Sequence, residues 1–182
     1  VTLGDGSRIA LNGGTQITLD RDDARYASLD RGEAQFDVVH SPSDPFTLHV
    51  SNAKIVDVGT RFNVDRDGRA FSVEVKEGAV RYSSGALDIP LSRGETLHVA
   101  PDGKATKGLR DAAAMGGWMQ GALQYETADY AAIASDLHRS TGIAVSVDPS
   151  LSDRSFTGVI QVGGPAGDVR RRVELLLGVT VR

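Results

Sequence analysis

The stretch "LDRGEAQF" (residues 29–36) decides how the first half of this chain is interpreted. Its glycine, Gly32, comes two residues after the polar Asp30, and apolar residues lie further out on both sides. The same arrangement returns in "VKEGAVRY" (75–82) and "LSRGETLH" (91–98). A glycine in the left-handed conformation at such a place is typical of a tight turn with a bulge, which folds one strand onto the next. The three stretches therefore predict hairpin turns in a twisted β domain.

The apolar residues between these turns recur with a period of two up to about residue 100. "FTLHV" (46–50) places Phe46, Leu48 and Val50 on one face, and "FSVEV" (71–75) alternates in the same way. Strict alternation of this kind indicates half-buried β-strands. We predict a hairpin-rich, all-β domain over residues 1–100.

A different pattern follows this domain. Residues 101–117 are rich in Gly, Ala and Lys, which favours a linker. Residues 118–182 alternate between strand and helix and predict a small β-α-β-β-α-β domain with its strands in one sheet, so the predicted fold class is mainly β plus α/β. We expect Thr127 to cap the first helix and Gly142 to end it. The side chains expected to face the core are Tyr130, Ile133, Ala134 and Leu137 on the first helix, and Val169, Val173, Leu176 and Leu177 on the second.

Composition excludes several classes of function. The 182 residues carry a formal net charge of −4 with acidic and basic residues mixed, which argues against a nucleic-acid partner and against a basic membrane anchor. The chain has no cysteine, which excludes disulfides, thiolate zinc sites and cysteine nucleophiles. No apolar run approaches the roughly 20 residues that span a bilayer, so we expect no direct membrane contact in this fragment.

No catalytic motif stands out. The four histidines His40, His49, His98 and His138 lack the spacing of metal ligands, and no nucleophile motif occurs. We therefore predict no metal, no cofactor and no turnover enzyme, but a binding or relay module. In "DVGTRFNVD" (57–65), a Gly-Thr step interrupts a strand pattern, and such a glycine usually marks a bulge or a close backbone approach.

Two features of the second domain are candidate partner-binding sites. The strand "SFTGVIQV" (155–162), with Phe156, Val159 and Ile160, could lie at a sheet edge that accepts a strand from another protein. The run Arg170, Arg171 and Arg172 is either the solvated face of a helix or a cationic edge that meets an acidic partner.

Several blocks together resemble FecR-like proteins, which are bacterial anti-sigma factors of the inner membrane. The first-domain blocks are "VTLGDGSRIALNGGTQI" (1–17), "RGEAQFDV" (31–38), "PFTLHV" (45–50), "VGTRFNV" (58–64), "VEVKEGAV" (73–80) and "LSRGETL" (91–97). Residues 118–151 resemble the short secretin/TonB N-terminal domain that ends those proteins. The resemblance implies an all-β juxtamembrane domain followed by this short domain.

The resemblance also implies a function. The chain would be the periplasmic fragment of a single-pass inner-membrane protein, and its partner would be the N-terminal signalling domain of a TonB-dependent outer-membrane transducer, commonly of a ferric-siderophore system. A cytoplasmic segment outside this sequence would bind an extracytoplasmic-function sigma factor, which site proteases release. Some members of the family cleave themselves at a Gly-Thr bond, and here that bond would be Gly59–Thr60.

Two other functions stay open on the sequence. A glycan-binding or other envelope-associated adhesion module would need exposed aromatic side chains, and the single tryptophan, Trp118, stands at the domain junction. A metal-dependent β-sandwich enzyme would need strands that bring His49 and His98 together.

Overall fold

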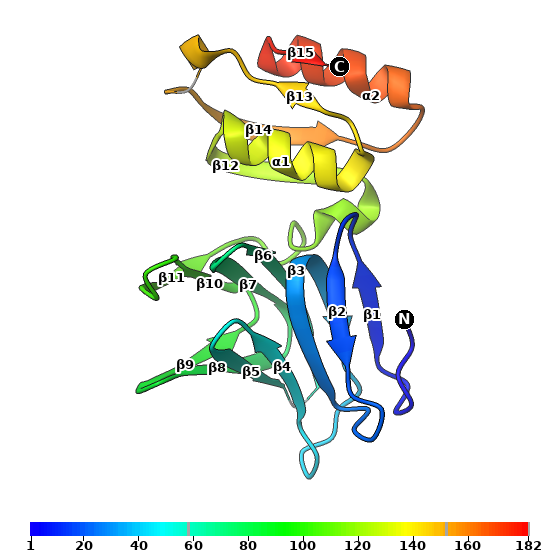
Figure 1. Ribbon diagram of the computed structural model, residues 1–182, viewed down its shortest axis with the longest axis vertical. Coiled ribbons are helices and arrows are strands. Elements are labelled where there is room, and N and C mark those ends of the chain that lie inside the picture. The colour runs from blue at the N-terminus through cyan, green and yellow to red at the C-terminus, as the bar shows by residue number, and fades with distance from the viewer. Residues whose placement is uncertain (58, 152, 182) are drawn as a thin grey trace. The chain divides into compact units, whose positions relative to one another are not determined.

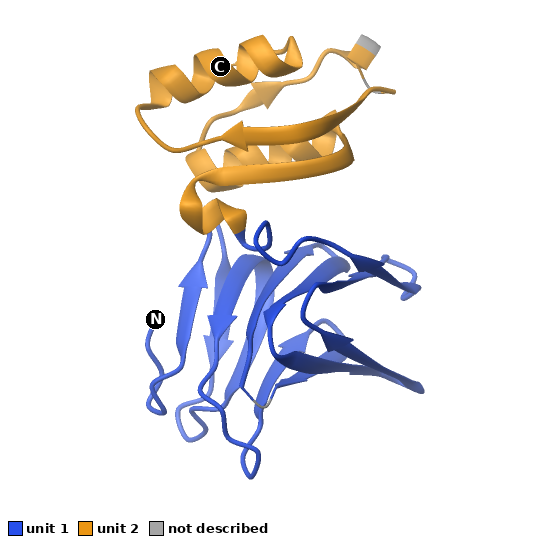
Figure 2. Ribbon diagram, turned by 180° about the vertical axis from the view of Figure 1, so that it is seen from behind, with its two compact units in different colours: residues 1–116 blue, residues 117–182 orange. Residues whose placement is uncertain are grey.

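The computed structural model describes residues 1–57, 59–151 and 153–181. It divides into two compact units, residues 1–116 and 117–182 (Figures 1 and 2). Strands predominate in the described residues, which confirms the mainly β prediction. None of the helices in the described part of the chain has the length and apolar character needed to cross a membrane.

The first unit is built from short strands joined by tight connections. They are β1 (Arg8–Leu11), β2 (Gln16–Leu19), β3 (Tyr26–Asp37), β4 (Phe46–Val50), β5 (Ala53–Asp57), β6 (Arg61–Asp67), β7 (Ala70–Glu77), β8 (Ala79–Ser84), β9 (Leu87–Ser92), β10 (Glu95–Val99) and β11 (Ala105–Leu109). Their hydrogen-bonded order is β11-β10-β7-β6-β3-β4-β5-β8-β9, and β1 and β2 also pair with β3.

The long strand β3 joins two sides of this curled sheet. Its first part pairs with β2 and, in parallel, with β4. Its second part pairs with β1 and β6. We call β1, β6, β7, β10 and β11 the β6 side, and β2, β4, β5, β8 and β9 the β4 side. Register with β2 shifts just before Gly32, where a bulge bends β3 from one side to the other.

The predicted hairpins at the three repeated glycine motifs are wrong. Gly32 lies inside β3, Gly78 lies between β7 and β8, and Gly94 lies between β9 and β10. At each of them the chain passes from one side of the sheet to the other, and the strands that flank Gly78 or Gly94 do not pair with each other. All three glycines have positive φ, as expected for bulges. A bulge increases the local twist of the chain, so the strand that follows it continues on the facing side of the sheet instead of folding back on the strand before it.

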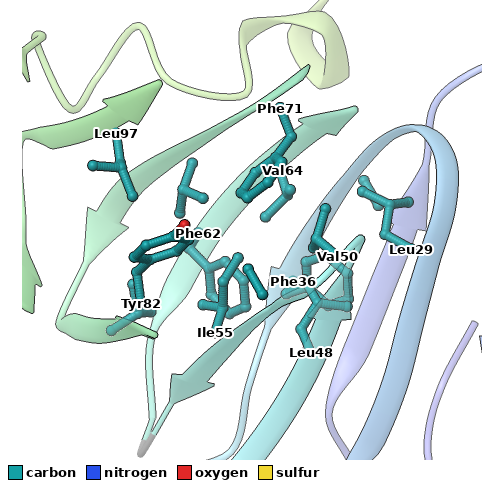
Figure 3. Close-up of a cluster of buried hydrophobic side chains, with 14 of the residues drawn as sticks. Leu29, Phe36, Leu48, Val50, Ile55, Phe62, Val64, Phe71, Tyr82 and Leu97 are labelled. Carbon is teal, nitrogen blue, oxygen red and sulfur yellow. The ribbon is translucent and has the colours of Figure 1, made fainter. Parts of the chain in front are cut away.

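The core of the first unit fills the space between the two sides (Figure 3). The predicted apolar face Phe46, Leu48 and Val50 is fully buried there. The rings of Phe71 on the β6 side and Tyr82 on the β4 side lie 6.2 Å apart between centroids. Burial of such rings dominates the hydrophobic stabilisation of a sandwich, so the alternating pattern found in the sequence is what holds the two sides together.

The segment predicted as a linker, 101–117, instead belongs mainly to the first unit. It contains β11, which pairs with β10 along its whole length, and the division between the units falls after Gly116. Met115 is fully buried, and its carbonyl accepts a hydrogen bond from Lys76 Nζ at 2.9 Å. The sequence did not predict this strand because β11 lies at the edge of the sheet and its side chains are mostly exposed. Its residues therefore do not alternate between apolar and polar.

The second unit has the predicted order of helices and strands. Its elements are the 3-10 turn η1 (Gly117–Gln120), β12 (Ala122–Asp129), α1 (Tyr130–Thr141), β13 (Val145–Ser146), the turn η2 (Pro149–Leu151), β14 (Ser155–Gln161), α2 (Ala166–Leu177) and β15 (Thr180–Val181). The strands form two separate pairs, β12 with β14 and β13 with β15, rather than the single sheet expected. One apolar cluster draws side chains from both pairs and from both helices, so the helices contribute the burial that a continuous sheet would have provided.

Two details of the helices differ from expectation. The N-cap of α1 is Asp129, whose carboxylate accepts from Ala132 N at 2.7 Å, because Thr127 still lies in β12, within a bulge. On α2, Val169, Val173 and Leu177 are buried but Leu176 is exposed. The buried residues are four apart, and this narrow stripe leaves Leu176 beside it.

Replacing Gly32 with alanine should destabilise the first unit by at least about 2 kcal/mol, because positive-φ strain adds to a steric collision. A Cβ at this position would lie 2.7 Å from Thr15 Cα. Urea unfolding measures the loss. The control is Gly85→Ala, which has positive φ but no neighbouring atom within 4 Å. It should lose only the strain contribution, and equal losses in the two variants would contradict the bulge argument.

Candidate functional site

The Gly59–Thr60 step lies where the chain passes from β5 to β6, so it is another passage between the two sides of the sheet. Gly59 has a φ of +132°, a backbone conformation that residues other than glycine rarely adopt. A Cβ at Gly59 would lie 2.6 Å from His40 Cα and 2.5 Å from His40 Nδ1. The strand pattern therefore breaks at Gly59 because the chain changes sides there, close against His40.

The carboxylate of Asp57 holds this step. Asp57 is fully buried, and its Oδ1 accepts hydrogen bonds from Gly59 N at 3.0 Å and from the Thr60 hydroxyl. Thr60 is also buried, and its carbonyl oxygen accepts from Val38 N at 2.9 Å. These bonds fix the Thr60 hydroxyl next to the peptide bond that joins Thr60 to Gly59.

Gly78 packs closely against Gly59 and Thr60. A Cβ there would lie 2.4 Å from Thr60 Cγ2 and 3.0 Å from the carbonyl oxygen of Gly59. Any larger residue would therefore displace Thr60. The carbonyl of Gly78 accepts from Arg93 N at 3.0 Å, and Gly94 N donates to Val75 O at 2.9 Å. The passages at Gly59, Gly78 and Gly94 are thus tied together at one end of the first unit.

A buried ion pair supports the segment that carries His40. The Arg25 guanidinium pairs with Asp5 and donates to Val39 O at 3.0 Å. Ser7 Oγ accepts from Val39 N at 3.0 Å and donates to Asp5 at 2.7 Å. Burial alone would raise the pKa of Asp5, but the hydrogen bonds from Ser7 and the charge of Arg25 lower that pKa below its ordinary value of 3.8.

The arrangement at Thr60 is one that can activate a nucleophile. A hydroxyl that donates to a carboxylate, next to a glycine held in an unusual backbone conformation, has the components of an internal acyl transfer. Sequence reasoning identified Gly59 and Thr60 but missed Asp57 and Gly78. The available signal for Asp57 was its position two residues before the glycine, since an aspartate commonly bonds the backbone two residues onward.

The predicted partner strand in the second unit separates into buried and exposed residues. Val159 is 46% exposed, whereas Ile160 is fully buried in the core. Phe156 packs against that core, and its ring meets the ring of Tyr125 edge-on at 6.2 Å. Of the three candidates, Val159 is the side chain that another protein could reach without repacking the core.

The three candidate arginines of α2 also differ. Arg170 and Arg171 are exposed. Arg172 is half-buried and donates through Nη1 to the carbonyl of Gln161, at the end of β14. The cationic surface is therefore formed by Arg170 and Arg171, while Arg172 fastens the helix to the strand.

The residues considered for other functions lie apart. His49 packs against the ring of Tyr26 on the β4 side, and His98 Nδ1 lies 3.1 Å from Ser72 Oγ on the β6 side. The described residues contain no group of three or more acidic or histidine side chains able to hold a metal ion. Trp118 packs against the core of the second unit.

Comparison with known proteins finds a family that the first unit resembles. The family model described as "FecR protein" matches residues 1–81. The chain is FecR-like. The matched residues include the passages at Gly32, Gly59 and Gly78, so the motifs that carried the resemblance are also the positions at which the FecR-like chain changes sides.

Two crystal structures resemble the FecR-like chain along its length, both of proteins from Parabacteroides distasonis ATCC 8503 that are provisionally described as anti-sigma factors. The first has a TM-score of 0.85 and 23% sequence identity, and the match covers 100% of this chain and 92% of that one. The second has a TM-score of 0.83 and 25% identity, with 98% and 86% covered. No curated protein sequence matches significantly. The resemblance to FecR-like anti-sigma factors predicted from the sequence is confirmed.

The Asp5 ion pair predicts how stability depends on pH. Because the pKa of Asp5 is lower in the folded chain than in the unfolded one, its stabilising contribution is complete above pH 3.8 and is lost as pH falls through the folded pKa. The difference in unfolding free energy between wild type and Asp5→Asn should therefore shrink below pH 3.8. Urea titrations between pH 2.5 and 7 measure it, and curves that stay parallel throughout would contradict the assignment.

Proposed function

We propose that this chain is the periplasmic sensor part of an anti-sigma regulator of the inner membrane. The observation that carries the proposal is the match of the whole chain, at a TM-score of 0.85, to a protein provisionally described as an anti-sigma factor. The FecR match over residues 1–81 supports the same regulatory role. The regulator would control an extracytoplasmic-function sigma factor through a cytoplasmic segment outside this sequence, with regulated proteolysis as the release step.

The signal would arrive through the second unit, from the N-terminal signalling domain of a TonB-dependent outer-membrane transducer. Two surfaces favour such a contact. Val159 is exposed on β14, and among the described residues β14 pairs with β12 alone, so its other edge has no strand partner. Arg170 and Arg171 add positive charge on α2 for an acidic partner. We expect a reversible interface that buries on the order of 1,200 Å² in total.

Calorimetric titration of the chain with the signalling domain of the transducer encoded beside it tests this proposal. Val159→Asp should weaken binding about tenfold or more, because a charge would be desolvated in the contact. The matched control is Leu109→Asp, which changes an apolar side chain, 82% exposed, on the first unit. It should leave the affinity unchanged.

The other outcomes of the titration are equally informative. If both variants bind like wild type, the contact is not on β14, and Arg170→Glu combined with Arg171→Glu would then test α2 separately. Loss of binding in the arginine variant, with a strong dependence of wild-type binding on salt, would place the interface on the helix. Absence of wild-type binding would exclude this transducer as the partner.

A second activity is favoured by the geometry at Thr60. We propose that the chain cleaves itself between Gly59 and Thr60 by transfer of the Gly59 acyl group to the Thr60 hydroxyl. The supporting observation is the buried hydrogen bond from that hydroxyl to Asp57, at a glycine whose φ is +132°. The products would be residues 1–59 and 60–182.

Thr60→Val should abolish these two fragments, because valine has nearly the same shape as threonine but no hydroxyl. Thr60→Ser retains a hydroxyl and should still cleave. Intact-mass spectrometry of freshly synthesised protein measures the fraction cleaved, and hydroxylamine should accelerate cleavage by trapping the ester. Fragments that persist in Thr60→Val would point to an outside protease.

A further inference from the structure

We propose that Asp57 is the catalytic base of this cleavage, and that it takes the Thr60 hydroxyl proton as Thr60 Oγ1 attacks the carbonyl carbon of Gly59. The inference rests on the self-cleavage proposed above and adds the residue that drives it. Asp57 is in direct contact with the reacting hydroxyl, and its Oδ1 also accepts the Gly59 N–H at 3.0 Å.

Burial makes Asp57 the natural acceptor for this proton. Asp57 is fully buried and Thr60 is 5% exposed, so solvent has little access to the hydroxyl. A nucleophile shielded from water needs a base within hydrogen-bond reach, and the carboxylate of Asp57 meets that requirement. Two bonds to the same carboxylate oxygen also fix the direction of the hydroxyl.

The same carboxylate can return the proton, so that the transfer balances. The bond from Thr60 Oγ1 to the Gly59 carbonyl carbon forms, and the bond from that carbon to Thr60 N breaks. The hydroxyl proton moves to Asp57 and then to the departing Thr60 nitrogen. Water hydrolyses the resulting ester, adding hydroxide to the carbonyl carbon and a proton to Oγ1.

The other titratable groups at this end are less suitable bases. His40 lies against Gly59, but it is exposed and the Thr60 hydroxyl donates to Asp57 instead. Glu77 pairs with Arg61 at 2.9 Å. Asp37 is shared between Arg61, at 3.5 Å, and Arg8, at 3.1 Å. The carboxylates of Asp37 and Glu77 pair with arginines at the surface. The buried carboxylate of Asp57 instead accepts hydrogen bonds from Gly59 and Thr60, where the reaction would occur.

The test is the rate of cleavage after cell-free synthesis, sampled over time and stopped in detergent. Asp57→Asn can still accept the hydrogen bonds from Gly59 and Thr60 but cannot take a proton, so cleavage should slow about 100-fold or more. Glu77→Gln makes the same chemical change at a carboxylate of the same end, which pairs with Arg61. It should cleave at the wild-type rate.

Folding must be separated from catalysis in these variants. Asp57→Glu keeps a carboxylate displaced by one methylene and should cleave at a rate between those of wild type and Asp57→Asn, with circular dichroism and urea unfolding recorded for each. Equal loss in the folded Glu and Asn variants would give Asp57 a structural role and overturn the inference. Wild-type cleavage in Asp57→Asn would overturn the inference alone, whereas an uncleaved wild type would overturn self-cleavage as well.

Discussion

The passage of β3 across the first unit at Gly32 is the constraint on which the other strands depend. β3 pairs with four strands, two through each of its halves, and every other strand of the unit joins this set directly or through a neighbour. The hydroxyl of Thr15 fixes the bend, since it donates to Glu33 O at 2.9 Å and accepts from Glu33 N at 3.0 Å. If the bend were lost, one strand could not belong to both sides, and the apolar faces would lose their partner surface.

The opposite end of the unit contains the passages at Gly59, Gly78 and Gly94. Unusual backbone conformations are maintained only where surrounding contacts enforce them. Here the contacts are the buried Asp57 carboxylate, the close approach of Gly78 to Thr60, and His40 held against Gly59 by the segment that Arg25 supports. An enforced conformation beside a buried hydroxyl is what the proposed acyl transfer requires. The contacts that fix the passage of the chain between the two sides of the sheet are therefore the same contacts that form the candidate site.

Period-two alternation predicted the buried faces correctly, because the direction of a side chain along a strand is a local property. Strand pairing is not local, so the motifs at Gly32, Gly78 and Gly94 could not distinguish a hairpin from a passage between the two sides. The break in alternation marked the Gly59–Thr60 step and the family resemblance gave it a candidate role, but neither could show the role of Asp57. The role of Asp57 depends on the positive φ of Gly59, which brings the Thr60 hydroxyl within hydrogen-bond distance of the Asp57 carboxylate.

The order of the strands also bears on how cleavage and signalling could coexist. Residues 1–59 supply β3, β4 and β5, which lie in the sheet between β6 and β8, and both of those strands belong to residues 60–182. The ladders β3–β6 and β5–β8 and the shared core would persist when the peptide bond between the two parts is broken. A broken bond at Gly59 would therefore leave the first unit assembled. Separation of the two parts would require the strands themselves to be pulled apart, since hydrogen bonds and core burial, not the peptide link, hold them together.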